Sequence, residues 1–123
     1  MNKLIRVALF TACCSIAAIA LADANGMWKA SFETQVGTQE YTFEFKVDGD
    51  KLTGMTKSNL LGENEIADGK VDGNTITFTE TGNYQGMPLT FTYTGEVIGD
   101  EEIRFTRALE GFEAEEFVAK RPE

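Results

Sequence analysis

The sequence predicts an all-β fold, an antiparallel up-and-down meander of about eight strands that closes into a small barrel. Apolar and polar residues alternate along most of the chain after residue 25, which is typical of strands with one buried face. No part of that region shows helical periodicity. Closure is expected because it removes the exposed edges of an open sheet.

Eight segments carry the alternation, and they span residues 27–34, 39–47, 51–57, 64–71, 75–80, 88–97, 102–107 and 113–120. Aromatic side chains occupy many apolar positions and are predicted to fill the core; they are Phe32, Tyr41, Phe43, Phe45, Phe78, Phe91, Tyr93, Phe105 and Phe117. Each buried ring stabilises the fold by about 1.5–3 kcal/mol. Without a disulfide, a domain of this size depends on such burial.

Three tight turns are predicted from an internal repeat. VDGDKLT at residues 47–53 recurs as VDGNTIT at 71–77 and more loosely as VIGDEEI at 97–103. Each copy is read as strand, turn and strand, with glycine supplying the positive φ that a two-residue hairpin turn needs.

Successive connections of a meander alternate between its two ends. The turns at 48–50, 72–74 and 98–101 therefore share one short, acidic end. The connections at 35–38, 58–62, 81–87 and 108–112 share the other end and are predicted to be longer. Exposed apolar residues at one end are typical of a binding surface. The candidate ligand- or partner-binding residues there are Leu60, Leu61, Tyr84, Met87 and Phe112. The alternative is that they fold inward and plug the barrel.

Two tyrosines fall on inward positions, where a buried hydroxyl needs a partner. Tyr41 and Tyr93 are therefore added to the candidate ligand-binding residues, as possible lining of a cavity inside the barrel. An eight-stranded barrel is either filled by side chains or holds one small ligand.

The N-terminus is predicted to be a cleavable signal peptide, residues 1–24. Lys3 and Arg6 precede an apolar run over 7–22, and Ala22-Asp23-Ala24 is a small-x-small cleavage site. The run is shorter than the roughly 18 residues of a membrane span. A secreted or periplasmic domain over residues 25–123, without a membrane span after cleavage, is expected.

Two alternatives to cleavage after Ala24 stay open. The segment FTAC at residues 10–13 resembles a lipobox, so a lipoprotein anchored at Cys13 or Cys14 is one. A retained anchor is the other.

The charge balance and residue content exclude several functions. Without residues 1–24, nine basic and nineteen acidic residues remain, a net charge of −10. Such a field repels nucleic acid and anionic lipid, and it favours cationic partners. The chain has no histidine, and no cysteine follows Cys14. Ser-His-Asp triads, Cys-His pairs and ordinary zinc or copper sites are thereby excluded, and no catalytic residue, metal or cofactor is predicted.

Three other patterns have ordinary structural explanations. Carboxylates that could act as an acid–base pair are more simply solvated side chains; they are Glu63, Glu65, Glu110, Glu113, Glu115 and Glu116. The oxygen-rich turns at 48–50 and 100–102 could bind calcium, but they lack EF-hand spacing. Threonine rows at 75, 77, 79 and at 90, 92, 94 could match a flat polymer, although threonine is also a good strand former.

Gly26-Met27-Trp28 resembles the Gly-x-Trp signature of the calycins, the lipocalin and avidin group of barrels. The resemblance implies that Trp28 closes one end of the barrel and that Arg121 or Lys120 packs on it. GDKLTG at residues 49–54 is similar to the second-turn region of avidins, but no match to avidin ligand contacts is present. The tail FVAKR at 117–121 also resembles that of small secreted bacterial β-domains of unassigned function.

These patterns together predict a secreted or periplasmic, non-enzymatic binding domain. It would hold a small apolar or amphipathic ligand, or an exported protein, at the long-loop end of the barrel. One alternative is an inhibitor or accessory module of an exported enzyme. Another is a carboxylate-dependent carbohydrate hydrolase.

Overall fold

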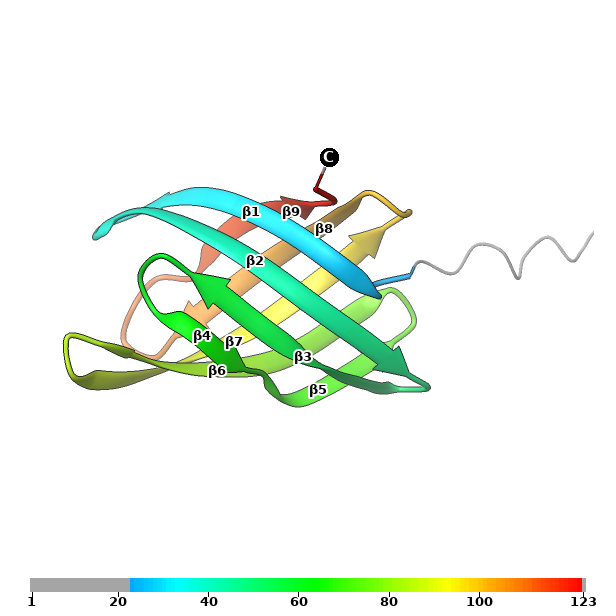
Figure 1. Cartoon of the computed structure of the whole chain (residues 1–123), viewed down its shortest axis with the longest axis horizontal. Coiled ribbons are helices and arrows are strands. Elements are labelled where there is room, and N and C mark those ends of the chain that lie inside the picture. Colours follow the sequence, from blue (N-terminus) through cyan, green and yellow to red (C-terminus); the bar gives the residue numbers. More distant parts are fainter. Residues whose placement is uncertain (1–22, 123) are drawn as a thin grey trace, which may run out of the picture.

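A computed structural model describes residues 23–122, so most of the predicted signal peptide, residues 1–22, lies outside the described residues. The described part consists of strands joined by turns, without a helix (Figure 1). The strands are β1 (Gly26–Thr34), β2 (Gly37–Asp48), β3 (Lys51–Ser58), β4 (Gly62–Glu65), β5 (Ala67–Asp72), β6 (Thr75–Tyr84), β7 (Met87–Ile98), β8 (Glu102–Leu109) and β9 (Glu115–Lys120). Within this range no helix has the length and apolar character needed to cross a membrane.

The strands form a closed antiparallel barrel, which confirms the predicted fold class. Strand order runs β2-β1-β9-β8-β7-β6-β5-β3-β4, and an additional β2–β3 pairing closes the ring. Eight strands complete the ring, and β4 is an extra strand that pairs with β3. The first and last strands meet where β1 pairs with β9, at Lys29 and Lys120.

The predicted strand 64–71 is in fact two strands. Ile66 separates them: it is buried, and its backbone N–H donates to the carbonyl of Gly54 at 3.0 Å. Just after it, Asp68 has a positive φ of 55° and the register with β6 shifts between Ala67 and Lys70. This β-bulge bends the chain, so that β4 stays on β3 while β5 moves across to β6.

The connections at the end opposite the acidic turns were predicted to be longer than those turns. This prediction is wrong for two of the four connections, those after β1 and β6. β6 and β7 continue into the expected loop at 81–87 and leave only Gln85 and Gly86 between them. These residues have φ values of 53° and 84°. This is the left-handed pair of a type I′ turn, whose twist matches that of the strands and lets the ladder run to its end. The β1–β2 connection is also a two-residue turn, Gln35 and Val36.

The repeated turns at the acidic end form as predicted. Gly49, Gly73 and Gly99 have φ values of 65°, 63° and 61°. The first two lie in two-residue turns, and the third lies in a three-residue turn.

Aromatic rings fill the barrel toward its acidic end. Phe43 is fully buried, and its ring centroid lies 5.1 Å from that of Phe105 and 6.0 Å from that of Tyr93. Phe105 in turn occupies the space beside Gly95 on the neighbouring strand.

Replacing Gly95 with valine tests how tightly this half of the barrel is packed. A Cβ atom at Gly95 would lie 2.7 Å from the Phe105 ring and 2.9 Å from Ile103. Gly95→Val should therefore lower the free energy of unfolding by about 1–3 kcal/mol through overpacking. Thr94→Val, on the outer wall one residue away, is the control and should stay within about 0.5 kcal/mol. Urea unfolding followed by Trp28 fluorescence measures both, and equal midpoints would contradict a filled core.

Candidate functional site

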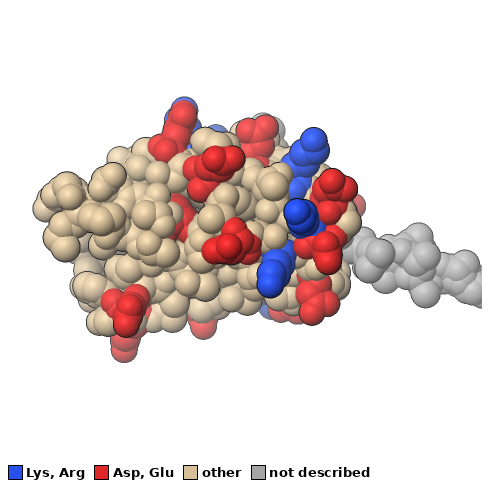
Figure 2. All heavy atoms as spheres, turned by 90° about the horizontal axis from the view of Figure 1, so that it is seen from below, with Lys and Arg blue, Asp and Glu red and all other residues tan. Residues whose placement is uncertain are grey.

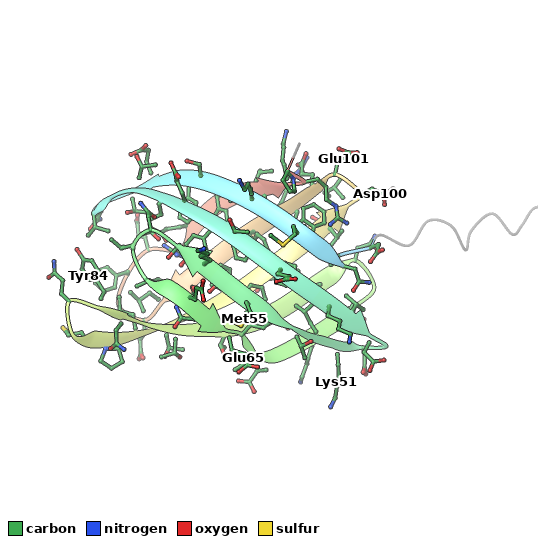
Figure 3. The ribbon with its side chains drawn as sticks, in the orientation of Figure 1. Lys51, Met55, Glu65, Tyr84, Asp100 and Glu101 are labelled. Carbon is green, nitrogen blue, oxygen red and sulfur yellow. The ribbon has the colours of Figure 1, made fainter. Side chains whose placement is uncertain are left out.

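The two ends of the barrel differ in chemical character. The turns after β2, β5 and β7 lie at the end where the N-terminal segment enters, and they carry Asp48, Asp50, Asp72, Asp100 and Glu101 (Figures 1 and 3). The turns after β1, β3, β6 and β8 lie at the opposite end. On the face shown in Figure 2, the basic side chains gather toward the first end, and the opposite end is mostly uncharged.

Exposed apolar side chains mark that opposite end. The described residues include seven exposed large hydrophobic side chains, and the three most exposed are Phe112 at 66%, Met87 at 64% and Val36 at 50%. All three lie at the same end: Val36 and Phe112 in the connections after β1 and β8, and Met87 as the first residue of β7, directly after the β6–β7 turn. We call Val36, Leu60, Tyr84, Met87 and Phe112 the apolar end.

The other predicted rim residues are less accessible. Leu60 and Tyr84 are half-buried. Leu61 is buried and packs toward Gly82, and its backbone N–H donates to Ser58 Oγ at 2.9 Å. The structure therefore leaves Met87 and Phe112 exposed, turns Leu61 inward, and adds Val36, which the sequence analysis did not single out.

The β6–β7 hairpin extends beyond its neighbouring strands. Its ladder runs to Tyr84 and Met87, whereas β7 pairs with β8 only from Phe91 onward. On the other side, β6 pairs with β5 no further than Thr79. The protruding tip carries Tyr84 and Met87, and Tyr84 is labelled there in Figure 3.

The tip is protected against strand pairing and is held together across its strands. Pro88 in β7 lacks the N–H that a further strand would need at that position. Thr81 Oγ1 and Thr90 Oγ1 lie 2.8 Å apart across the hairpin. A partner would therefore contact the side chains of the tip more readily than it would add a strand to the edge of the hairpin.

A buried polar network lies inside the barrel, and Glu80 of β6 is its acceptor. Glu80 is fully buried. Its Oε1 accepts hydrogen bonds from the hydroxyls of Tyr41 at 2.9 Å and Tyr93 at 2.7 Å. Its Oε2 accepts one from Thr56 Oγ1 at 2.7 Å. Three hydroxyl donors on three other strands thus satisfy one carboxylate.

Arg107 of β8 supplies the opposite charge of the network and is almost completely buried. Its Nη1 donates to Tyr41 Oη at 3.1 Å, to Tyr93 Oη at 3.4 Å and to Gln39 Oε1 at 3.3 Å. Its Nε donates to Glu115 Oε1 at 2.8 Å. The guanidinium also lies 4.1 Å from the Phe91 ring centroid and 5.0 Å from that of Phe32, which are cation–π contacts.

The network shifts the pKa values of its members. Burial, and then the Glu80 carboxylate, raise the pKa of both Tyr41 and Tyr93 above the ordinary tyrosine value. Burial acts to lower the pKa of Arg107, but Tyr93, Tyr41 and Glu115 outweigh it, so that this pKa lies above its usual value. The tyrosines thus stay neutral donors and the guanidinium stays charged.

The predicted cavity residues Tyr41 and Tyr93 therefore have partners from the protein itself. Their hydroxyls each accept from Arg107 and donate to Glu80. Four residues of the network were not predicted from the sequence: Glu80, Arg107, Thr56 and Gln39. The strand alternation does indicate that two of them face inward. Glu80 follows Ile76 and Phe78 on alternate positions, and Arg107 follows Ile103 and Phe105 in the same way.

Trp28 and Arg121 meet at the acidic end. The Arg121 guanidinium lies 3.8 Å from the centroid of the Trp28 ring. Trp28 is fully buried, and its Nε1 donates to the carbonyl of Ala24 at 2.9 Å. Lys120, the other basic residue considered for this contact, is exposed on the outer wall.

The other sequence candidates lie on the surface or are paired. Glu115 is bound by Arg107, and Glu63 pairs with Lys57 at 3.6 Å. In residues 23–122 no group of three or more histidine, cysteine or acidic side chains is placed to hold a metal ion. The threonine rows of β6 and β7 do lie on neighbouring strands, with Thr77 opposite Thr94 and Thr79 opposite Thr92.

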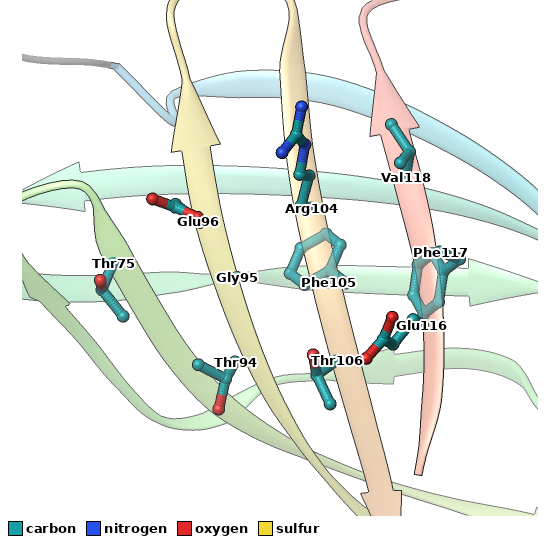
Figure 4. A pocket seen from close by; sticks show the side chains of 10 residues that line it. All are labelled: Thr75, Thr94, Gly95, Glu96, Arg104, Phe105, Thr106, Glu116, Phe117 and Val118. Atoms are coloured by element: carbon teal, nitrogen blue, oxygen red, sulfur yellow. The ribbon is translucent and has the colours of Figure 1, made fainter.

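Two open grooves run along the outer wall rather than into the barrel. One, of about 650 Å³, crosses β7, β8 and β9, with Glu96, Arg104 and Glu116 among its lining residues (Figure 4). The other, of about 670 Å³, lies over β1, β2 and β3. Arg104 is already engaged, since its Nε donates to Glu102 at 2.9 Å.

The fold and site define a class of protein: an antiparallel up-and-down barrel with a packed interior, one acidic end and one apolar end. No protein-family model, curated protein or solved structure matches the chain.

Removal of the Glu80 carboxylate tests the network. Glu80→Gln keeps the shape but gives the three buried hydroxyls a poorer acceptor. Arg107 keeps its ion pair with Glu115 but loses the negative charge beyond the two tyrosines, so the free energy of unfolding should fall by about 1–3 kcal/mol. Glu116→Gln, on the exposed face of β9, is the matched control and should stay within about 0.5 kcal/mol. Adding Arg107→Met should cost less than the sum of the two single changes, with a coupling of about 1 kcal/mol or more. Additive effects in chemical denaturation would contradict the network.

Alkaline titration tests the buried tyrosines. Because folding raises their pKa values, the unfolded state loses these protons first, so the stability is present below about pH 10 and is lost as the pH rises above it. In a Tyr84→Phe variant, Tyr41 and Tyr93 are the only tyrosines left in the chain. Tyrosinate absorbance should then rise together with the change in Trp28 fluorescence. Full ionisation in a barrel with native fluorescence would contradict the assignment.

Proposed function

We propose that this protein is a secreted or periplasmic, non-enzymatic binding domain with a calycin-like barrel. It holds a small apolar or amphipathic ligand, or an exported protein, at the apolar end. The observation that carries the proposal is the position of Phe112, Met87 and Val36, the three most exposed large apolar side chains, at one end of the barrel. Gathered exposed apolar residues at connections are typical of interaction sites.

The filled interior favours binding on the apolar end over binding inside the barrel. Tyr41, Tyr93 and Phe43 are buried in ring contacts, and the hydroxyls of the two tyrosines are satisfied by Glu80 and Arg107. A ligand inside would have to displace these groups and leave charges unpaired, which is costly. A ligand or partner at the end displaces only water.

A second candidate is an inhibitor or accessory module of an exported enzyme. The protruding β6–β7 tip favours it, because a projecting hairpin can enter the cleft of a larger protein. Tyr84 and Met87 flank the turn at this tip, and tyrosine and methionine are both enriched at protein interfaces.

A triple substitution at the apolar end tests the proposal. The protein is titrated with a neutral alkyl glycoside below its critical micelle concentration, and the backbone amide chemical shifts are measured by NMR. The shifts should concentrate in the turns at 35–36, 85–86 and 110–114. Val36→Ser, Met87→Ser and Phe112→Ser together should weaken the response by about tenfold or more, since each removes apolar contact area.

The control for this experiment is the triple variant Met27→Ser, Met55→Ser and Val118→Ser. These side chains are also exposed and apolar but lie on strands of the wall. The control should bind like the wild type. Shifts centred on Tyr93, or equal loss in both variants, would contradict binding at the apolar end.

Native mass spectrometry of the protein purified from its own host separates the two candidates. A retained small amphiphile supports the ligand-binding domain, and a retained exported protein supports the accessory module. A bare barrel, together with an unchanged response in the Val36, Met87 and Phe112 variant, would contradict both.

A further inference from the structure

The junction between the predicted signal peptide and the barrel offers two small-x-small sites. Ala20-Leu21-Ala22 would give cleavage after Ala22, and Ala22-Asp23-Ala24 would give cleavage after Ala24. The sequence pattern accepts both. The contacts of Asp23 and Ala24 with the barrel distinguish them.

Ala24 is part of the barrel core. It is buried, with 4% of its surface exposed. Its carbonyl accepts the hydrogen bond from Trp28 Nε1, and Trp28 is itself fully buried. Loss of Ala24 would leave the indole N–H without this acceptor inside the protein, and an unpaired buried donor is costly.

Asp23 is held by the residue that covers Trp28. Arg121 Nη2 donates to the Asp23 carbonyl at 3.1 Å, and Nη1 donates to the Asn25 carbonyl at 2.6 Å. Asp23 Oδ1 accepts the backbone N–H of Asn25 at 2.9 Å. The side chain of Asn25 then accepts the N–H of Val47 at 2.7 Å. Residues 23–25 thus join the start of β1 to β2 and to Arg121, the residue that follows β9.

Cleavage after Ala24 would also place the new ammonium group close to a positively charged side chain. The new ammonium group would lie on Asn25, whose carbonyl accepts from the Arg121 guanidinium. Two positive groups would then lie close together. After cleavage at Ala22 the ammonium group lies on Asp23, whose carbonyl also accepts from Arg121, at 3.1 Å. There the carboxylate of Asp23 itself offsets the added positive charge, which Asn25 cannot do.

We infer that the precursor is processed after Ala22, so that Asp23 is the first residue of the exported barrel. Water hydrolyses the Ala22–Asp23 peptide bond in a signal peptidase, leaving a carboxylate on Ala22 and an ammonium group on Asp23. The exported chain then has nine basic and twenty acidic residues, a net charge of −11. This inference rests on the predicted export and is independent of binding at the apolar end.

Expression of the full precursor in a bacterial host with an export pathway tests the site. Intact mass and N-terminal sequencing of the exported protein should show a start at Asp23. A start at Asn25, an uncut chain, or a lipid-modified start at Cys13 or Cys14 would each overturn the inference.

Substitutions that affect one site and not the other sharpen the test. Ala20→Phe places a large residue at the third position before the Ala22 cut and should block processing. Ala24→Phe blocks the alternative cut and also crowds the barrel core, so its readout is the first residue of the cleaved chain, which should still be Asp23. Ala18→Phe, which is at neither recognition position, is the control. Processing that survives Ala20→Phe and stops in Ala24→Phe would overturn the inference.

A deletion measures what the two residues contribute to the folded barrel. Removing Asp23 and Ala24 from the precursor yields, after cleavage at Ala22, a chain that starts at Asn25. Its thermal midpoint should fall by roughly 5 °C or more. Asp23→Asn, which keeps both carbonyls, is the control and should stay near the wild type. An unchanged midpoint after the deletion would contradict a structural role for these residues.

Discussion

Two opposite charges inside the barrel, Glu80 and Arg107, are joined through tyrosine hydroxyls. Tyr41 and Tyr93 each accept a hydrogen bond from Arg107 and donate one to Glu80. A hydroxyl has one proton, so the charges on either side fix its direction. The network crosses the barrel from β2 to β6, β7 and β8, and an uncompensated member would be a buried charge. The packing of the interior must therefore satisfy this network.

The network also connects the core to the apolar end. Glu115 is the member of the network at the surface, since its carboxylate binds Arg107 and remains partly exposed. Glu115 begins β9, directly after the connection that presents Phe112. The anchored guanidinium thereby fixes one end of the connection that carries the most exposed apolar side chain of the described residues. A rigid base below an exposed apolar side chain suits a binding surface, because less conformational freedom is lost on association.

The sequence predicts the wall of the barrel well because the wall depends on local alternation. The interior network was not predicted, because its bonds join residues far apart in the chain, such as Gln39 and Arg107. Alternation places Glu80 and Arg107 inward, at the last residues of the predicted strands 75–80 and 102–107, but nothing local indicates that the two charges share a network across the barrel. The short turn at Gln85 was missed for a different reason: a non-glycine residue rarely adopts a positive φ. Both errors concern positions where hydrogen bonding, between side chains across the barrel or between the strands of a hairpin, overrides the ordinary preference of the residue.

The closure at Trp28 determines how the barrel presents its apolar end. The chain enters at the acidic end, where Arg121 covers Trp28 and holds the carbonyls of Asp23 and Asn25. The apolar end lies at the far side of the barrel from this entry (Figure 1). A barrel released by cleavage presents that end freely. A barrel tethered through a lipid on Cys13 or Cys14 would still point it away from the membrane, because the tether joins at the acidic end. Under either of these proposed modes of export, the apolar end would therefore face the surrounding solution.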